Sequence, residues 1–244
     1  MKHLKLFNEH SDYLNFKESE DYVSPNVSYC KDEHKSHYYP LTNHEYVDLG
    51  LPSGTLWATD YIKNESGDVL YFAWGEAQGY TSGQVGTYKN FSFDDYAFGV
   101  YDTGDTINYG YTKYNADDGK TTLDTEDDAA FAYWGKKWRI PTLEQFEELM
   151  NSEYTTFTWN SNNNSATFAS KANGNSITFL SYGYAFDGQV YYYNQEIATF
   201  SKTALGIPDA GGISIWSGGN EVFASYRNLG VPIRPVRFKR FLSI

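Results

Sequence analysis

One helix-forming stretch, residues 134–150 (WGKKWRIPTLEQFEELM), lies in the middle of a chain whose other patterns favour strands and turns. Thr142 and Gln145 have the spacing of a capping box at its start. Four apolar residues follow at helical spacing: Leu143, Phe146, Leu149 and Met150. A helix with strands before and after it predicts the α+β class, in which helices cover an antiparallel sheet joined by hairpins.

Another helix is predicted just before this one, over residues 126–134. Thr125 and Asp128 resemble a capping box, acidic residues crowd the first turn, and Gly135 fits the position after the last turn. Residues 138–140 should form a short strand or bridge between the two helices.

We expect the second helix to be a packing element and no active site. Its apolar face would cover the sheet, and Trp134 and Trp138 would fill the gap beside it. Arg139 could donate hydrogen bonds to carbonyls of the long loops, because its guanidinium carries five donors.

Strands are predicted where apolar, β-branched and aromatic residues stand between Gly, Pro, Asn and Ser. Before the helices these are YVDLG (46–50), TLWAT (55–59) and VLYFAW (69–74). After them come QVYYYN (189–194), GISIW (212–216), EVFASY (221–226) and VPIRPVRF (231–238). ATFASKA and NSITFLS (166–181) form a predicted hairpin around Asn173-Gly174, the strongest short-range turn signal.

Two further regions of the domain have a predicted role. Residues 75–120 are rich in Gly, Tyr, Asp and Asn and lack periodicity, so we expect long ordered loops there. IRPVRF should be a closing strand near the first strand of the domain, with Arg234 buried or bracing a loop.

The composition restricts the class of partner. Aromatic residues make up 18% of the 244 residues, with 23 tyrosines, which is too aromatic for a disordered chain. The formal net charge is −12, whereas nucleic-acid binding requires a basic surface and anionic membranes attract basic segments. We therefore expect neither nucleic acid nor membrane insertion.

Residues 1–44 differ from the rest and are predicted to be an N-terminal arm, with a display domain over residues 45–244. All five histidines lie in the arm: His3, His10, His34, His37 and His44. Asn8 could cap a helix over residues 9–19, and VSYC (27–30) could be a short strand. The arm has too few apolar residues to fold alone, so it should order on a partner or along its own domain.

The chain has one cysteine, Cys30, so no intrachain disulfide can form. No apolar run near the N-terminus resembles a signal peptide, and no segment approaches the length of a membrane span. We expect a protein made and folded in a cytoplasm.

A family resemblance rests on motifs that occur in a fixed order over roughly residues 45–238. The motifs are VDLGLPSGTLWAT, YFAWGE, KYN, DG, EDDAA, WGKKWRIPT, EQFEEL, NGNSITFL and GVPIRPVRF. Together they resemble the Fibrobacter succinogenes major paralogous domain, which is related to the formylglycine-generating-enzyme branch of the C-type-lectin fold. The resemblance implies twisted antiparallel sheets with two helices and long loops. That branch includes diversified tip proteins whose variable surface lies near the C-terminus.

The arm is similar to another group of proteins. LFNEHSDYLNF, VSPNVSYC and HYYP resemble the N-terminal segments of virion proteins in crAss-like gut phages. This implies an arm that docks on other virion proteins, in a protein made in the host cytoplasm and placed on the virion.

No catalysis is expected. Formylglycine chemistry in the resembled enzymes needs cysteines in the C-terminal part of the domain, whereas Cys30 lies in the arm. The domain has no histidine after His44, which excludes a Ser-His-Asp triad there.

Two groups of residues could bind a metal, although we expect no obligatory cofactor. Cys30, His34 and His37 have a loosely zinc-like spacing but lack a fourth ligand. Five acidic residues could supply oxygens to calcium: Asp117, Asp118, Asp124, Glu126 and Asp127. They do not fit the EF-hand pattern, and the alternative is helix capping and solvation.

The predicted ligand-binding surface is C-terminal and rich in Tyr, Trp, Asn and Ser. Its residues are Tyr191, Tyr192, Tyr193, Asn194, Trp216, Asn220, Glu221, Phe223, Ser225, Tyr226 and Asn228. Aromatic rings offer rigid stacking area and amides offer adaptable hydrogen bonds, as in paratopes and sugar-binding faces. The alternative is that the aromatic residues belong to the core and the polar ones to turns.

These observations predict a phage virion surface protein, as a head fibre, tail fibre or decoration. Its lectin-like domain would bind a glycan or protein on a host such as Bacteroides without covalent chemistry. Two alternatives remain open: a structural virion cement without a host ligand, and a bacterial surface adhesin. Whether the protein forms a homo-oligomer is also open, because no heptad run is present.

Overall fold

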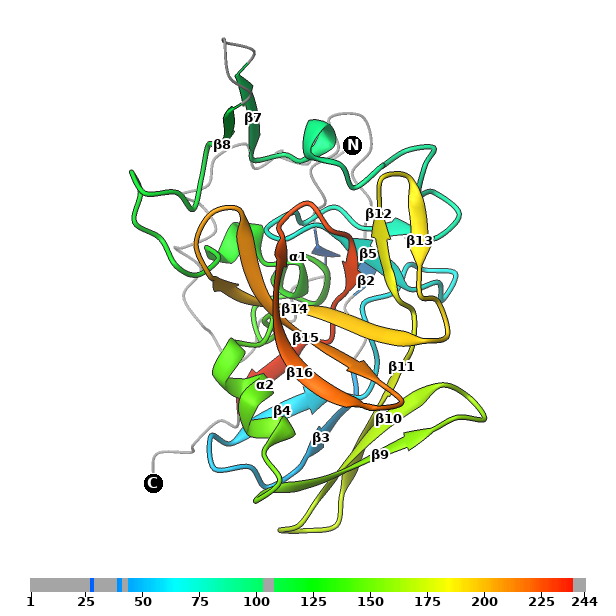
Figure 1. Cartoon of the computed structure of the whole chain (residues 1–244). Coiled ribbons are helices and arrows are strands. Elements are labelled where there is room, and N and C mark those ends of the chain that lie inside the picture. Colours follow the sequence, from blue (N-terminus) through cyan, green and yellow to red (C-terminus); the bar gives the residue numbers. More distant parts are fainter. Residues whose placement is uncertain (1–26, 29–38, 41–43, 103–107, 239–244) are drawn as a thin grey trace, which may run out of the picture.

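The computed structural model describes residues 27–28, 39–40, 44–102 and 108–238. Within these residues the chain forms small antiparallel sheets and two α-helices, which is an α+β arrangement (Figure 1). The predicted class is therefore confirmed.

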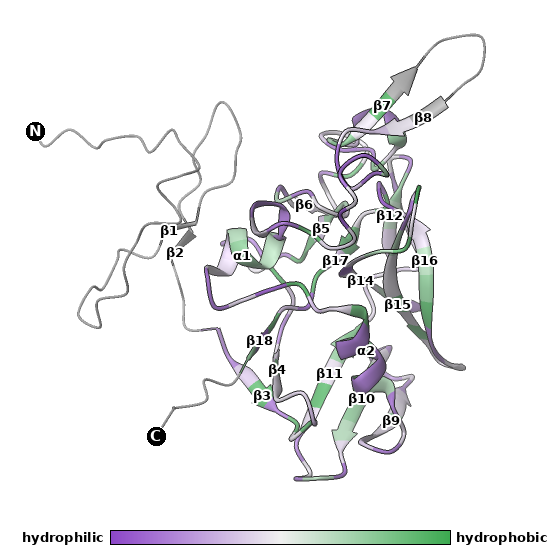
Figure 2. Ribbon diagram, turned by 90° about the vertical axis from the view of Figure 1, so that its left-hand side faces the viewer, coloured by the Kyte–Doolittle hydropathy of each residue, from purple (hydrophilic) through white to green (hydrophobic). Residues whose placement is uncertain are grey.

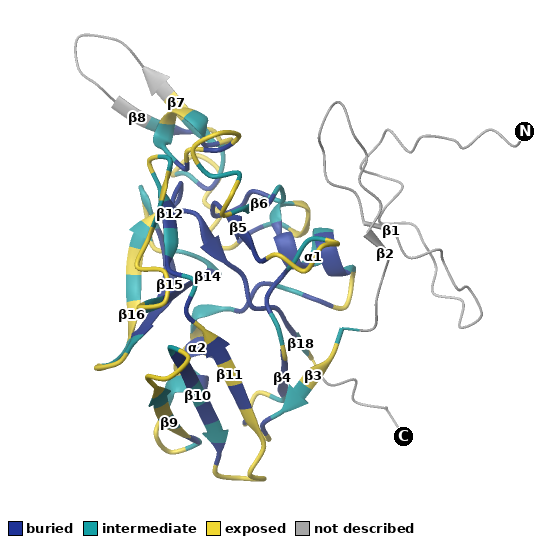
Figure 3. Cartoon of the chain, turned by 90° about the vertical axis from the view of Figure 1, so that its right-hand side faces the viewer, coloured by how far each residue is buried: buried dark blue, intermediate teal, exposed yellow. Residues whose placement is uncertain are grey.

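The longest strands form one three-stranded sheet near the middle of the molecule. Its strands are β14 (Glu196–Ala204), β15 (Asp209–Trp216) and β16 (Gly219–Tyr226), in that order. β14 was not among the predicted strands. β15 is almost wholly buried, whereas β16 forms an edge with alternating exposed residues (Figure 3). Therefore β16 and the turn before it lie at the surface.

A second three-stranded sheet contains the predicted hairpin. It consists of β9 (Thr155–Asn160), β10 (Ser165–Ser170) and β11 (Ser176–Leu180), with β10 in the middle. Ile177 and Phe179 face inward while their neighbours on β11 are exposed, as expected for a sheet with one face in solvent. Apolar positions on β10 and β11 and the hydrophilic outer side of α2 are visible in Figure 2.

Two further three-stranded sheets join the two ends of the domain. One has the order β18 (Val236–Phe238), β4 (Thr55–Ala58), β3 (Tyr46–Asp48). The other has the order β17 (Val231–Pro232), β5 (Leu70–Phe72), β6 (Tyr80–Thr81). The predicted strand over residues 231–238 is thus wrong as a single strand. It divides between two sheets. Its second part, β18, pairs with β4 and lies in the sheet that contains the first strand, β3, as predicted.

Three two-stranded ladders complete the described strands. They are β1 (Val27–Ser28) with β2 (Tyr39–Pro40), β7 (Gly99–Asp102) with β8 (Asn108–Tyr111), and β12 (Tyr184–Phe186) with β13 (Gln189–Tyr191). β1 includes part of the predicted VSYC strand. The helix predicted over residues 9–19 lies outside the described residues.

Residues 75–120 include short regular elements in addition to the predicted loops. They contain β6, β7, β8 and the 3-10 helix η2 (Phe93–Asp95). A buried ion pair braces the loops, with Lys89 Nζ 2.9 Å from the Glu76 carboxylate, which also accepts the N–H of Ala97 at 2.8 Å. Burial raises the pKa of Glu76, and the ammonium of Lys89 opposes that rise.

The helix predicted after the capping residue Thr142 is confirmed as α2 (Leu143–Met150). Thr142 Oγ1 accepts the N–H of Gln145 at 3.2 Å, and Gln145 Oε1 accepts the N–H of Thr142 at 2.8 Å, which completes the capping box. Phe146 and Leu149 are fully buried. α2 therefore begins and packs as its residue pattern predicts.

The helix before it begins later than predicted. α1 spans Ala129–Trp134, and a 3-10 helix, η3 (Thr125–Asp127), precedes it. Asp128, not Thr125, is the N-cap residue: Asp128 Oδ1 accepts the N–H groups of Ala130 and Phe131. The carboxylate also accepts the N–H of Ile140 at 3.0 Å, so a contact distant in sequence fixes the helix start.

The connection between the helices has the predicted bridge, since Arg139 pairs with Val236. Trp134 and Trp138 are buried and meet edge to face at 5.0 Å. The prediction for Arg139 is wrong: its guanidinium donates to the carbonyls of Lys136 and Trp138, within its own connection, and lies over Phe131.

The Asn173-Gly174 hairpin is confirmed, but its turn is longer than two residues. β10 ends at Ser170 and β11 begins at Ser176. The Ser170 hydroxyl stabilises this longer turn, because it accepts the N–H of Ala172 at 3.1 Å and donates to the Leu49 carbonyl at 2.5 Å.

Two buried arginines hold carbonyl groups in the interior. Arg234 is buried, as predicted, and lies over the rings of Tyr61 and Phe179. Its guanidinium donates to the carbonyls of Ala58 in β4 and Thr178 in β11, so it joins two strands and does not brace a loop. Arg227 donates to the carbonyls of residues 114, 206 and 209. Burial lowers the pKa of both guanidinium groups.

Candidate functional site

Three consecutive tyrosines of the predicted surface are exposed at a sharp turn. The predicted strand 189–194 ends at Tyr191, because Tyr192 and Asn194 have positive φ angles of 51° and 61°. The carbonyl of Tyr192 accepts the N–H groups of Gln195 (2.9 Å) and Glu196 (3.0 Å). We call residues 191–195 the tyrosine turn. Tyr191, Tyr192 and Tyr193 are 36%, 51% and 50% exposed.

Gly183 allows this turn to form. Its φ is 62°, and a Cβ at this position would overlap the backbone carbonyl oxygen of Tyr191. The N–H of Gly183 donates to the carbonyl of Glu196 at 2.8 Å. A residue without a side chain is therefore required beneath the tyrosine turn.

A surface hollow of about 490 Å³ lies beside the tyrosine turn. Its lining combines two tryptophans with hydroxyl, amide and carboxylate groups: Trp159, Ser161, Asn164, Tyr192, Asn194, Gln195, Glu196, Trp216 and Ser217. We call this set the Trp hollow. The sequence prediction had named three of the nine, Tyr192, Asn194 and Trp216.

Three separate segments line the Trp hollow: the β9–β10 turn, the tyrosine turn with the start of β14, and the end of β15 (Figure 1). Trp159 lies near the end of β9, and Trp216 ends β15 opposite Glu196 in the β14–β15 ladder. Strand pairing thus fixes one tryptophan beside the carboxylate, while the hairpin supplies the other.

Ser181 ties these walls together. Its N–H donates to the carbonyl of Asn164 at 3.1 Å, and its carbonyl accepts the N–H of Asn194 at 3.2 Å. Its hydroxyl donates to the carbonyl of Glu196 at 2.7 Å. Because Ser181 is buried and uses all three groups, the segments around the hollow are held in one arrangement.

The lining amides and carboxylate differ in how they are held. Glu196 Oε1 accepts the hydroxyl of Ser214 at 2.6 Å, which orients the carboxylate. Asn194 and Gln195 are exposed, and Asn164 and Glu196 are half-buried. Hence the hollow offers acceptors and donors beside two aromatic surfaces.

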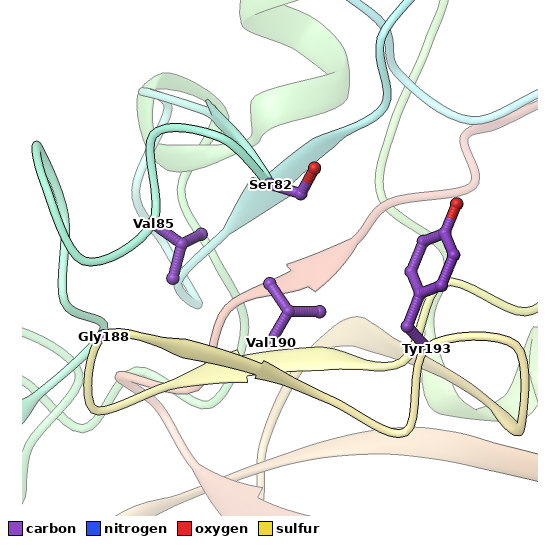
Figure 4. Close-up of a pocket in the computed structure, with 5 residues that line it drawn as sticks. All are labelled: Ser82, Val85, Gly188, Val190 and Tyr193. Carbon is purple, nitrogen blue, oxygen red and sulfur yellow. The ribbon is translucent and has the colours of Figure 1, made fainter.

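Tyr193 belongs to a second, smaller hollow of about 370 Å³, shown in Figure 4. Ser82, Val85, Gly188 and Val190 line it with Tyr193, whose ring stands over the hollow. The tyrosine turn therefore separates two hollows, with consecutive tyrosines on either side.

The remaining predicted residues lie along β16 or in the interior. Asn220 is half-buried and Glu221 is exposed near the Trp hollow end of the strand, while Ser225 and Tyr226 lie at its other end. The ring of Phe223 packs against Phe200 and the core. Asn228 is buried, and its side chain donates to the carbonyl of Phe91 at 2.9 Å. Phe223 and Asn228 therefore contribute to packing.

Six residues of the Trp hollow were not predicted: Trp159, Ser161, Asn164, Gln195, Glu196 and Ser217. A signal for the first three existed, because Trp159 lies in the alternating stretch TTFTWN (155–160), which precedes a polar turn. That pattern predicts a strand ending in an exposed hairpin, which β9 and β10 form.

The acidic residues proposed for calcium surround a lysine. Asp124, Glu126 and Asp127 come together, and Lys113 Nζ lies 3.0 Å from Asp124 and 3.5 Å from Glu126 and contacts Asp127. Burial lowers the pKa of Lys113, but hydrogen bonds to Asp127 and Asp124 raise it by more than burial lowers it. The net shift of this pKa is therefore upward. A cation would have to displace this ammonium group.

The other metal candidates are placed elsewhere or not described. Asp118 accepts the N–H groups of residues 114, 115 and 120 within its own loop, and Asp117 is exposed beside it. The zinc-like set, Cys30, His34 and His37, lies outside the described residues.

His44 is the histidine within the described residues. Its ring stacks on Trp134 at 3.7 Å with an interplanar angle of 10°. Burial lowers its pKa to about 4. This end of the arm thus packs on the domain and lies in the aromatic cluster behind α1.

No protein-family model matches the chain, and no significant match was found among curated proteins or solved structures. Within the described residues, none of the helices is long and apolar enough to cross a membrane.

Proposed function

We propose that this chain is a non-catalytic binding protein whose Trp hollow binds a glycan on a host cell surface. The observation that supports this most is the composition of the hollow, in which Trp159, Trp216 and Tyr192 surround amide and hydroxyl groups. Sugar rings have apolar C–H faces that pack on aromatic planes, while their hydroxyls bond to amides and carboxylates.

A single hollow of this kind would bind weakly. Its volume of about 490 Å³ suits a few sugar units, and much of the lining stays exposed to solvent. Affinity would then come from many copies acting together, because linked sites gain effective concentration without new contacts.

The biological setting is part of the proposal and rests on the sequence resemblance. The chain would be a phage virion surface protein, attached to other virion proteins by residues 1–44. Its domain would have a C-type-lectin-like fold, with which antiparallel sheets and two helices agree. The proposed partner is a glycan on a gut bacterium such as Bacteroides.

Binding to intact Bacteroides cells, with and without their capsular polysaccharide, tests the proposal. We expect saturable binding of a multivalent display of the full chain, and loss of that binding after Trp159→Ala with Trp216→Ala. Tyr88→Ala is the matched control, since Tyr88 is also an exposed aromatic residue but is neither part of the predicted surface nor of the Trp hollow.

Binding is compared only among variants that circular dichroism shows to be folded. Binding that requires the capsule and the two tryptophans supports a glycan adhesin. Binding that survives their removal places the ligand elsewhere on the protein. No binding on multivalent display would favour the alternative, a structural virion cement.

A further inference from the structure

The charges of the residues that line the Trp hollow indicate which class of ligand it can bind. Glu196 is the charged residue among the nine that line the hollow, and Lys, Arg and His are absent from that set. Proteins that recognise carboxylate, sulfate or phosphate groups usually supply Arg or Lys, whose donors pair with those anions. The lining residues supply a fixed acceptor instead.

Glu196 is held in place from several directions. Its backbone pairs with Trp216 in the β14–β15 ladder, and its carbonyl accepts from Ser181 and Gly183. Its Oε1 accepts the Ser214 hydroxyl at 2.6 Å. A carboxylate fixed in this way can turn its other lone pairs toward the ligand, and only a donor such as a sugar hydroxyl can bind them.

A second carboxylate lies on the same face of the sheet. Glu221 pairs with Ser214 in the β15–β16 ladder, so the side chains of both residues lie on the face that carries Glu196. Glu221 is exposed, and the whole chain has a formal net charge of −12. The potential at the hollow is therefore negative, and an anionic ligand would be repelled.

We infer that the Trp hollow selects glycans without carboxylate, sulfate or phosphate groups, with Glu196 as the residue that rejects acidic ones. This inference rests on the proposed glycan binding. The aromatic rings would stack on the sugar faces, the amides of Asn164 and Asn194 would bond to hydroxyls, and Glu196 would accept from a hydroxyl.

A pair of polysaccharides with the same backbone can test this inference. Multivalently displayed full chain is first measured against mannan, galactan, amylose and laminarin, which carry primary alcohols, and against polygalacturonate, hyaluronan and heparin. A neutral polymer that binds is then oxidised so that its primary alcohols become carboxylates. We expect the oxidised form to bind at least ~10-fold more weakly at low salt, because like charges at close range repel.

The variant Glu196→Gln separates charge from shape, since it keeps an acceptor oxygen and removes the charge. We expect it to reduce the preference for the neutral polymer to roughly threefold or less. Glu65→Gln is the matched control, because it changes the net charge equally at an exposed residue outside the hollow.

The outcomes distinguish this inference from the proposed function. Stronger binding of acidic polymers, or a preference that Glu196→Gln leaves unchanged, overturns the inference while glycan binding stands. Absence of binding to every polysaccharide overturns both. A neutral preference that Glu196→Gln removes and Glu65→Gln retains supports the inference.

Discussion

Two regions of the molecule use the same residue types in opposite ways. In the core beneath the loops, the hydroxyls of Tyr71 and Tyr96 donate to the carbonyls of Tyr182 and Trp74, each at 2.7 Å. In the tyrosine turn, three consecutive tyrosines are exposed. Buried tyrosines here serve folding, whereas exposed tyrosines held by a strained turn are available to a partner.

Tryptophans and carboxylates divide in the same manner. Trp74 is buried and donates to the carbonyl of Ser201 at 2.8 Å, while Trp159 and Trp216 line the Trp hollow at partial exposure. Asp128 is buried beneath backbone N–H groups, whereas Glu196 lines the hollow. Variants of a buried and of an exposed member of each residue type test this division.

Truncation of one tyrosine from each region should separate folding from binding. Tyr71→Ala removes a ring that is 1% exposed, and we expect the free energy of unfolding to fall by about 3–5 kcal/mol. Tyr192→Ala should change it by about 0.5 kcal/mol or less. Urea denaturation measures both, and comparable losses for the two variants would contradict the division.

The buried carboxylate should have a measurable pH dependence. Burial raises the pKa of Asp128 from 3.8 to about 6 in the folded protein, although N–H donors from Ile140, Phe131 and Ala130 and the charge of Arg139 oppose the rise. The folded state then binds the proton more tightly than the unfolded state does. The stabilisation from protonation is present below about pH 4 and is lost as pH rises through about 6.

Asp128→Asn removes this titration and keeps a residue that can cap the helix. Relative to the variant, the wild type should lose about 2 kcal/mol of unfolding free energy between pH 4 and pH 6. Denaturant titrations at several pH values would show it. Parallel pH curves for the two proteins would show that the carboxylate does not titrate in this range.

The glycine beneath the tyrosine turn links the two regions. Gly183→Ala places a Cβ against the Tyr191 carbonyl at a φ of 62°, so we expect a loss of roughly 2 kcal/mol in unfolding free energy. Ligand binding at the Trp hollow should fall with it, because the turn carries Tyr192 and Asn194. Gly174→Ala is the control: it too has positive φ but open space around it, and binding should persist.

Local signals in the sequence predicted the parts of the structure that depend on near neighbours. The capping box of α2 joins residues three apart, and the apolar stripe of that helix follows from its period. Exposure of some residues among Tyr191–Tyr193 was expected because these aromatic residues are consecutive, although residues 189–194 were predicted to be a strand and not a turn. In contrast, α1 starts at Asp128 because that carboxylate also binds the N–H of Ile140, which no short-range pattern shows.

The Trp hollow could not be predicted from the sequence alone, because its residues come from separate segments of the chain. Trp159 and Trp216 come from different sheets, and Ser181 connects their neighbours through three hydrogen bonds. Nothing in the residues around Ser181 signals that role. Phe223 and Asn228 show the converse, since residue type favoured a surface role for both, whereas Phe223 packs against the core and Asn228 is buried.

Removal of a single hydroxyl gives the smallest and most selective comparison. Tyr71→Phe keeps the ring and deletes the donor to the Tyr182 carbonyl, so we expect a loss of about 1 kcal/mol, the usual net value of one hydrogen bond. Tyr191→Phe, at an exposed ring of the turn, should leave stability unchanged within ~0.5 kcal/mol. Equal losses would mean that the exposed hydroxyl also supports the fold, and the tyrosine turn would then belong to the structural group of aromatic residues. A loss confined to Tyr71→Phe would assign folding to the buried tyrosine and leave the exposed tyrosines of the turn available for recognition.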